Sequence, residues 1–243
     1  MIKKKNKTNR IWEIDYLRGF AFIFMIYDHV IFDINNIFNI HTNFLWGYDY
    51  LIGDISARMF MILCGIACTL TEKNVKRGLQ VFGCALGLSV VTITAEYFTN
   101  QTLGIRFGIL HFLGIAMILS QFVKKLHPAF IAVISVVCFA VPKIVFPFIY
   151  KLSNQNRMFL FPFGITSKGF TSADYYPLFP FLGFVFIGLV LGKILYKKKK
   201  SLFKFKLPPK FLIWIGQNSL ILYLVHQPIF LAVLYLIFWI FAA

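Results

Sequence analysis

The stretch 10-RIWEIDYLRGFAFIFMIYDHVIFD-33 is apolar enough to cross a lipid bilayer, yet it carries several ionisable side chains. Ionisable groups within a membrane span are costly, and they usually serve a function. At about 3.6 residues per turn, one helical face carries Asp15, Arg18, His29 and Asp33 within roughly 60° of one another, whereas Asp28 lies on a different face. This polar stripe places a cation toward one end and an imidazole about 16 Å further along, at a rise of about 1.5 Å per residue.

The composition is that of an integral membrane protein. Of the 243 residues, 59% are hydrophobic and 19% aromatic, and the mean hydropathy is +0.74, well above ordinary soluble usage. The net charge of +16 does not indicate nucleic-acid binding, because the Lys and Arg residues form short clusters between long apolar runs. The cysteines all lie inside apolar runs, which argues against a secreted disulfide framework.

Seven apolar runs are long enough to cross a hydrocarbon core of about 30 Å. We predict an all-α, polytopic helical bundle forming a single domain over 1–243, with spans at about 14–36, 54–72, 79–98, 105–123, 127–149, 176–196 and 214–240. One set of alternate connections holds 18 of the 25 Lys and Arg residues. Cytoplasmic loops carry such an excess, so the pattern predicts a multi-pass protein of the cell membrane with its N-terminus in the cytoplasm and its C-terminus outside.

Two outer connections are more than short links. The segment 37–53 is rich in aromatic and Asn residues and could lie at the membrane interface, although it could equally be a plain amphipathic loop. The segment 150–175 is longer than most connections and has the length of a lid or binding loop.

The first span supplies the candidate catalytic residues. The imidazole of His29 can exchange protons near neutral pH and can also act as a nucleophile. Asp33 lies one turn further on, where a carboxylate could orient the imidazole and strengthen it as a base. The alternative is a buried histidine that serves only the structure. Asp15 and Arg18 could pair with each other, or Arg18 could face a cytoplasmic anion such as the phosphates of an acyl carrier.

Polar residues of the other spans are candidates for substrate binding. They are Arg58, Arg106, His111, His226 and Gln227, each with a structural alternative. Pro228 interrupts the hydrogen-bond ladder of the last span next to His226, and a kinked polar point in a span usually lines a cavity. Cys64 and Cys68 share a helical face, but no histidine spacing accompanies them, so no metal site is predicted.

Five segments in register resemble the bacterial branch of the heparan-alpha-glucosaminide N-acetyltransferase catalytic-domain family, and the chain is also similar to a shortened acyltransferase-3 membrane enzyme. The segments cover most of the chain and read EIDYLRGFAFIFMIYDHVIFD, SARMFMILCGIACTL, RFGILHFLGIAMIL, SADYYPLFPFLGFVFIGLVLGKIL and IGQNSLILYLVHQPI. The family's first-span motif, an acidic residue followed by LRG and then a histidine about three turns later, falls on Asp15, Leu17, Arg18, Gly19 and His29.

The resemblance implies a membrane acyltransferase that moves an acetyl group from cytoplasmic acetyl-CoA to a sugar or cell-envelope glycan. Acetyl-CoA is then the acyl-donor substrate, and the bilayer, the donor and the glycan acceptor are the partners. His29 would act as general base or as a covalent acyl carrier. Two alternatives remain open, a small membrane transporter and a non-catalytic scaffold of the cell envelope, because a polar stripe and a kinked last span also suit a transport path.

Overall fold

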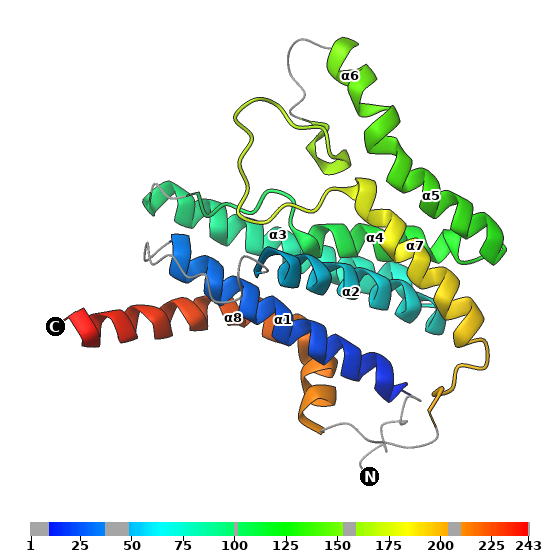
Figure 1. Ribbon diagram of the computed structural model, residues 1–243, viewed down its shortest axis with the longest axis horizontal. Helices are drawn as coiled ribbons and strands as arrows, with labels where there is room; N and C mark the ends of the chain where they lie inside the picture. The colour runs from blue at the N-terminus through cyan, green and yellow to red at the C-terminus, as the bar shows by residue number, and fades with distance from the viewer. Residues whose placement is uncertain (1–9, 37–48, 100–101, 153–158, 204–209, 243) are drawn as a thin grey trace. The chain divides into compact units, whose positions relative to one another are not determined.

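The computed structural model describes residues 10–36, 49–99, 102–152, 159–203 and 210–242. Within these ranges the chain is all-helical (Figure 1). The elements are α1 (Trp12–Asn36), α2 (Asp49–Leu70), α3 (Asn74–Thr99), α4 (Ile109–Val123), α5 (Pro128–Ile144), α6 (Phe146–Leu152), η1 (Phe161–Phe163), α7 (Leu178–Leu195) and α8 (Lys210–Ala242). Most of the segment 37–53 lies outside the described residues, and so do residues 153–158 of the segment 150–175.

Each of the seven predicted spans contains a helix, so the prediction of an all-helical chain is confirmed. Five stretches of the described chain are both long and apolar enough to cross a membrane, namely Leu51–Leu70, Asn74–Thr99, Pro128–Lys151, Leu178–Leu195 and Lys210–Leu234. The helix α1 is not among them because its ionisable and amide residues lower its hydropathy. The helix α4 has only 15 residues, because residues 105–108, predicted as helical, are non-helical and lie before it.

Contacts divide the chain into two compact units, and the boundary between them falls within α2. The terminal unit comprises Met1–Phe60 and Lys198–Ala243, and the central unit comprises Met61–Lys197. A single functional domain over 1–243 therefore stays a prediction.

In the terminal unit, α1 packs along α8 (Figure 1). The helices approach so closely that a Cβ atom on Gly19 would collide with the backbone of Leu212, and one on Gly216 with the backbone of Asp15. Phe22 and Met25 of α1 form a core with Ile215 of α8. The hydroxyl of Ser56 on α2 donates a 2.8 Å hydrogen bond to the Ala21 carbonyl, which fixes the first half of α2 against α1.

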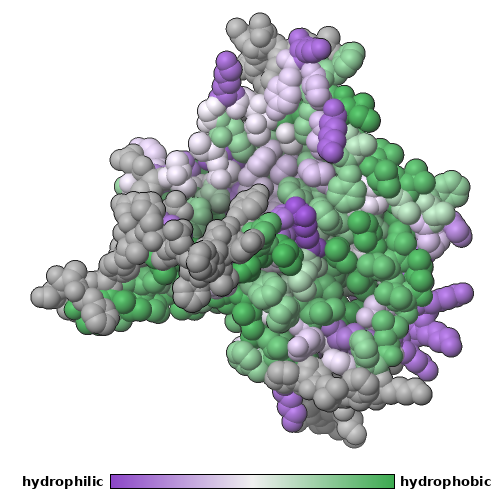
Figure 2. All heavy atoms as spheres, viewed as in Figure 1, coloured by the Kyte–Doolittle hydropathy of each residue, from purple (hydrophilic) through white to green (hydrophobic). Residues whose placement is uncertain are grey.

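In the central unit, α3 pairs with α4 and α5 with α7. Glycines again permit close contact, since Gly78 and Gly114 face each other across the α3–α4 interface. The Ser135 hydroxyl donates a 2.8 Å hydrogen bond to the Gly183 carbonyl, which ties α5 to α7. Away from these contacts the helices expose apolar side chains, such as Phe130 and Val136, each 67% exposed. Hydrophobic side chains cover much of the face seen in Figure 2, as expected for helices that contact lipid.

Candidate active site

A pair of histidines lies between α1 and α8 in the terminal unit. The ring centroids of His29 and His226 are 5.1 Å apart, and the ring planes meet at 49°. The Nδ1 atom of His226 lies 2.6 Å from the Tyr223 carbonyl oxygen. Because a carbonyl can only accept, Nδ1 carries the proton and Nε2 is left with a free lone pair. That Nε2 atom is buried and has no hydrogen-bond partner among the described residues.

Aromatic rings surround His226. Around His226 lie the rings of Phe22, Tyr223 and Phe230, with centroids at 6.2, 5.3 and 6.3 Å. The residue is only 7% exposed. An aromatic wall of this kind excludes water, and electrostatic interactions are stronger where water is excluded. The unpartnered Nε2 atom is therefore able to accept a proton next to His29.

The same two helices carry a carboxylate and an amide close to the histidines in sequence. Asp33 follows His29 by four residues, and Gln227 directly follows His226. The Nε2 atom of Gln227 donates to both oxygens of Asp33, at 3.0 and 2.9 Å. Asp33 is 1% exposed, so this amide is an essential partner for a buried carboxylate. The sequence predicted that Asp33 would orient His29, but within the described residues the hydrogen bonds of Asp33 run to Gln227 and none joins it to His29.

A second polar cluster lies near the start of α1. Arg18 and Asp15 form an ion pair at 3.2 Å, and the other carboxylate oxygen of Asp15 accepts a 3.3 Å hydrogen bond from Gln217 of α8. Both interpretations of Arg18 remain open, because its side chain is 20% exposed and can reach an anion while it stays near Asp15. Arg58 of α2 pairs with Asp54 one turn earlier on the same helix.

The remaining predicted site residues, Arg106 and His111, belong to the central unit. His111 accepts a hydrogen bond from the Gly108 backbone at Nδ1 and contacts the Ser89 hydroxyl at Nε2, each at 3.2 Å. Ser89 gives its own proton to the Ile105 carbonyl, so Nε2 of His111 is the donor in this contact. Both ring nitrogens are thus engaged, and His111 organises the start of α4.

Arg106 fixes the loop before α7. Its guanidinium contacts Glu96 at 3.4 Å and donates to the Thr171 carbonyl, while its backbone N–H donates to the Ser172 hydroxyl at 3.0 Å. The described part of the segment 150–175 is therefore anchored in the central unit. Burial, and secondarily the nearby Tyr150, raises the pKa of Tyr175 to about 12, so its hydroxyl stays protonated and donates to the Phe161 carbonyl at 2.6 Å.

Several residues that shape these clusters were not predicted from the sequence. Asp174 caps α4 by accepting from the Ile109 backbone N–H at 2.9 Å, and Ser89 holds His111. No local signal marks such residues, because their partners lie far away in the sequence. Tyr223 could have been found, since it lies three residues before His226 and the carbonyl at that spacing is within reach of a helical side chain.

The thiols give no sign of a metal centre. None of the four cysteines forms a disulfide in the described chain. No group of three or more His, Cys, Asp and Glu side chains that could hold a metal occurs in the part of the chain that the structure describes.

The fold and the site define the chain as a helical membrane protein in which a buried imidazole with an unpartnered nitrogen, that of His226, contacts a second imidazole, that of His29. The model of the family heparan-alpha-glucosaminide N-acetyltransferase, catalytic, matches residues 10–228. The chain belongs to this family, as its sequence motifs predicted. No curated protein and no solved structure matches it.

Proposed function

We propose that this protein is a membrane acetyltransferase that transfers an acetyl group from acetyl-CoA to an amine or hydroxyl group of a sugar or cell-envelope glycan. The family name supports an N-acetyltransferase activity and hence acetyl-CoA as the donor substrate. The observation that carries the proposal is the contact between His29 and His226, with an unpartnered Nε2 atom in an aromatic enclosure.

In the proposed reaction the acceptor attacks the thioester carbonyl of the donor directly. A bond forms between the acceptor nitrogen or oxygen and the carbonyl carbon, and the carbon–sulfur bond then breaks to release CoA. His29 takes the acceptor's proton as general base and returns it to the leaving thiolate, a role that commonly contributes about 10²–10⁴-fold. In the covalent alternative, His29 itself first carries the acetyl group.

The neighbours of His29 have supporting roles. His226 lies at ring-contact distance and is held in one tautomer by the Tyr223 carbonyl. In the proposal the lone pair on its Nε2 atom stabilises the protonated state of the pair. The Asp33–Gln227 pair keeps the neighbouring turn of α1 fixed to α8, and the Oε1 atom of Gln227 is buried without a partner among the described residues. That oxygen can accept a hydrogen bond from a hydroxyl or amino group of the acceptor substrate.

The donor enters from the cytoplasmic side in this proposal. The distribution of Lys and Arg supports a cytoplasmic N-terminus, an external C-terminus and a location in the cell membrane. Arg18 would then lie toward the cytoplasm, where it can hold a phosphate of the donor. His29 lies about 16 Å further along α1, a distance that an extended pantetheine arm can cover. The proposal assigns no step to Arg58, Arg106 or His111, because each already has local partners.

The test is acetyl transfer by purified protein in lipid nanodiscs, with radiolabelled acetyl-CoA as donor and glucosamine as probe acceptor. His29→Gln should lower the rate by about 10²–10⁴-fold and leave the melting temperature nearly unchanged. The control is His127→Asn, since His127 is an exposed histidine that caps α5 and Asn also caps helices well.

Two results would contradict the proposal. One is a His29→Gln protein that keeps the wild-type rate. The other is a folded wild-type protein that releases no CoA with any amino sugar or glycan but carries solute across vesicles, which would favour the transporter.

A further inference from the structure

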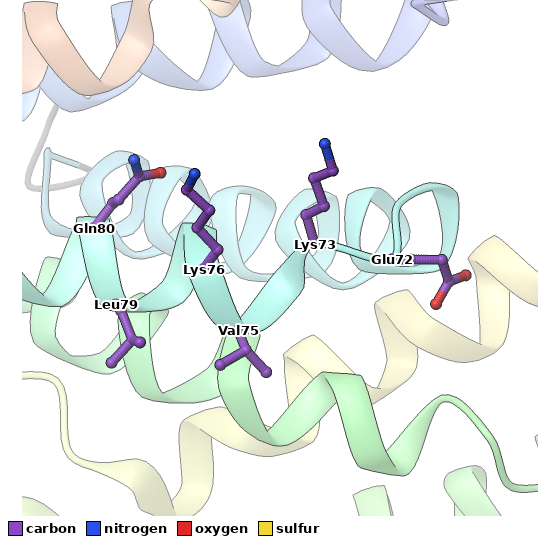
Figure 3. A pocket seen from close by; sticks show the side chains of 6 residues that line it. All are labelled: Glu72, Lys73, Val75, Lys76, Leu79 and Gln80. Carbon is purple, nitrogen blue, oxygen red and sulfur yellow. The ribbon is translucent and has the colours of Figure 1, made fainter.

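A groove opens at the start of α3, in the central unit. Its volume is about 600 Å³. Two adjacent rows of side chains line it, from the start of α3 and from the two residues before this helix, as Figure 3 shows. One row is polar and the other mainly apolar, and the lining residues are Glu72, Lys73, Val75, Lys76, Leu79 and Gln80.

The groove has an excess of positive charge. Lys73, Lys76 and Gln80 follow one another at helical spacing and point to the same side of α3 (Figure 3). The single carboxylate of the lining, Glu72, forms a 2.7 Å ion pair with Lys124, the residue that follows α4. Its charge is therefore already balanced, and the two lysines give the groove a net attraction for anions.

The groove also borders an apolar surface. Residues Asn74–Thr99 form a stretch long and apolar enough to cross a membrane, so the lysines lie at the level where a span meets the lipid headgroups. Further along α3, apolar side chains are exposed: Leu79 is 58%, Leu86 50% and Val90 67% exposed. At spacings of seven and four residues these three share one helical face. A cationic groove thus continues into a strip that contacts hydrocarbon.

We propose that this groove binds one anionic phospholipid, with the phosphate between Lys73 and Lys76 and the acyl chains along Leu79, Leu86 and Val90. The amide of Gln80 can donate a hydrogen bond to the headgroup. The juxtaposition of cations and exposed apolar side chains fits a phospholipid better than a soluble phosphate, because a soluble ligand gains nothing from the strip. The proposal does not depend on the acetyltransferase activity.

The test is native mass spectrometry of the purified protein after exchange into mixed micelles with phosphatidylglycerol or phosphatidylcholine. Wild-type protein should retain phosphatidylglycerol in preference to phosphatidylcholine. The double variant Lys73→Gln/Lys76→Gln should bind phosphatidylglycerol about 30-fold more weakly, since each lysine near an anionic surface contributes roughly fivefold. Both lysines are exposed, so the variant should fold.

Two further variants sharpen the test. The variant Lys143→Gln/Lys151→Gln removes the same charge from exposed positions toward the C-terminal end of the span Pro128–Lys151. It should still bind phosphatidylglycerol. Lys73→Arg/Lys76→Arg keeps the charge and should also retain it, which separates a binding defect from a folding defect.

Three outcomes would overturn the proposal. The first is equal retention of phosphatidylglycerol by the wild-type protein and the Gln variant. The second is retention of added CoA, lost in the Gln variant, with no preference between the two lipids, which would make the groove a site for a soluble phosphate. The third is a dimer that carries no lipid and dissociates in the Gln variant, since a second copy would then occupy this surface.

Discussion

The imidazole rings of His29 and His226 lie 5.1 Å apart, although the two residues come from the first and the last helix of the described chain. Neither helix alone brings two imidazoles together. In the resulting site, Nε2 of His226 has no hydrogen-bond partner within the described ranges. A pair with one basic nitrogen can hold a proton between two positions, which suits a reaction that takes up and returns a proton.

The first prediction concerns the coupling of the two histidines. His29→Gln and His226→Gln should each lower the transfer rate, and the double variant should lose little more than the worse single variant. Groups that act as a unit show this non-additivity. Steady-state rates of the four proteins in one nanodisc preparation measure it, and strictly multiplicative losses would mean that the histidines act independently.

The second prediction concerns the buried carboxylate of Asp33. Gln227→Ala should destabilise the protein by about 1–3 kcal/mol, because it leaves a buried acceptor without its partner. Gln217→Ala is the matched control: it removes an amide from Asp15, which keeps its ion pair with Arg18, and should cost less. Thermal unfolding of the two variants in the same detergent gives the comparison, and equal shifts would show that the loss of the Gln227 amide does not leave Asp33 worse off than a carboxylate with a second partner.

The third prediction concerns the close contact of α1 and α8. Gly216→Ala should separate these helices and destabilise the protein by about 1–3 kcal/mol, because the added methyl group meets the Asp15 backbone rather than a flexible side chain. Gly87→Ala in α3 meets no atom within 4 Å and should leave the melting temperature nearly unchanged. The acetyl-transfer rate should fall with Gly216→Ala as well, since the helices carry one histidine each.

The fourth prediction concerns Asp174, which caps α4 from the loop before α7. Asp174→Ala should cost about 1 kcal/mol, a typical value for loss of a helix cap, whereas Asp174→Asn keeps an acceptor oxygen and should be close to wild type. Limited proteolysis should cut the 159–176 segment faster in the Ala variant, because the loop then loses an anchor. Identical cleavage of the Ala and Asn variants would argue against this anchoring role.

Much of the architecture could be predicted because it depends on local properties of the chain. The predicted span 127–149 corresponds to the apolar stretch Pro128–Lys151, which the structure divides into α5 and α6. The predicted span 105–123 began too early, because Phe107 instead forms a backbone bridge with Tyr175. Pairing with a distant segment is not visible in local hydropathy, and it decided where this helix begins.

The residues of the candidate site could be predicted from the sequence, but which of them contact one another could not. His29, Asp33, His226 and Gln227 could each be recognised as polar residues in apolar segments. Helical spacing suggested that Asp33 would serve His29, because residues four apart share a face. The structure instead gives Asp33 to Gln227 and His29 to His226.

The sequence alone determined that this chain is helical and embedded in membrane, because bilayer thickness sets the length of an apolar run and charge is excluded from its centre. It also determined the family, through motifs that run in order along the chain. Only the tertiary structure decided which polar groups meet. That choice depends on how closely two helices approach, and here Gly19 and Gly216 let α1 and α8 come together so that the two histidines touch.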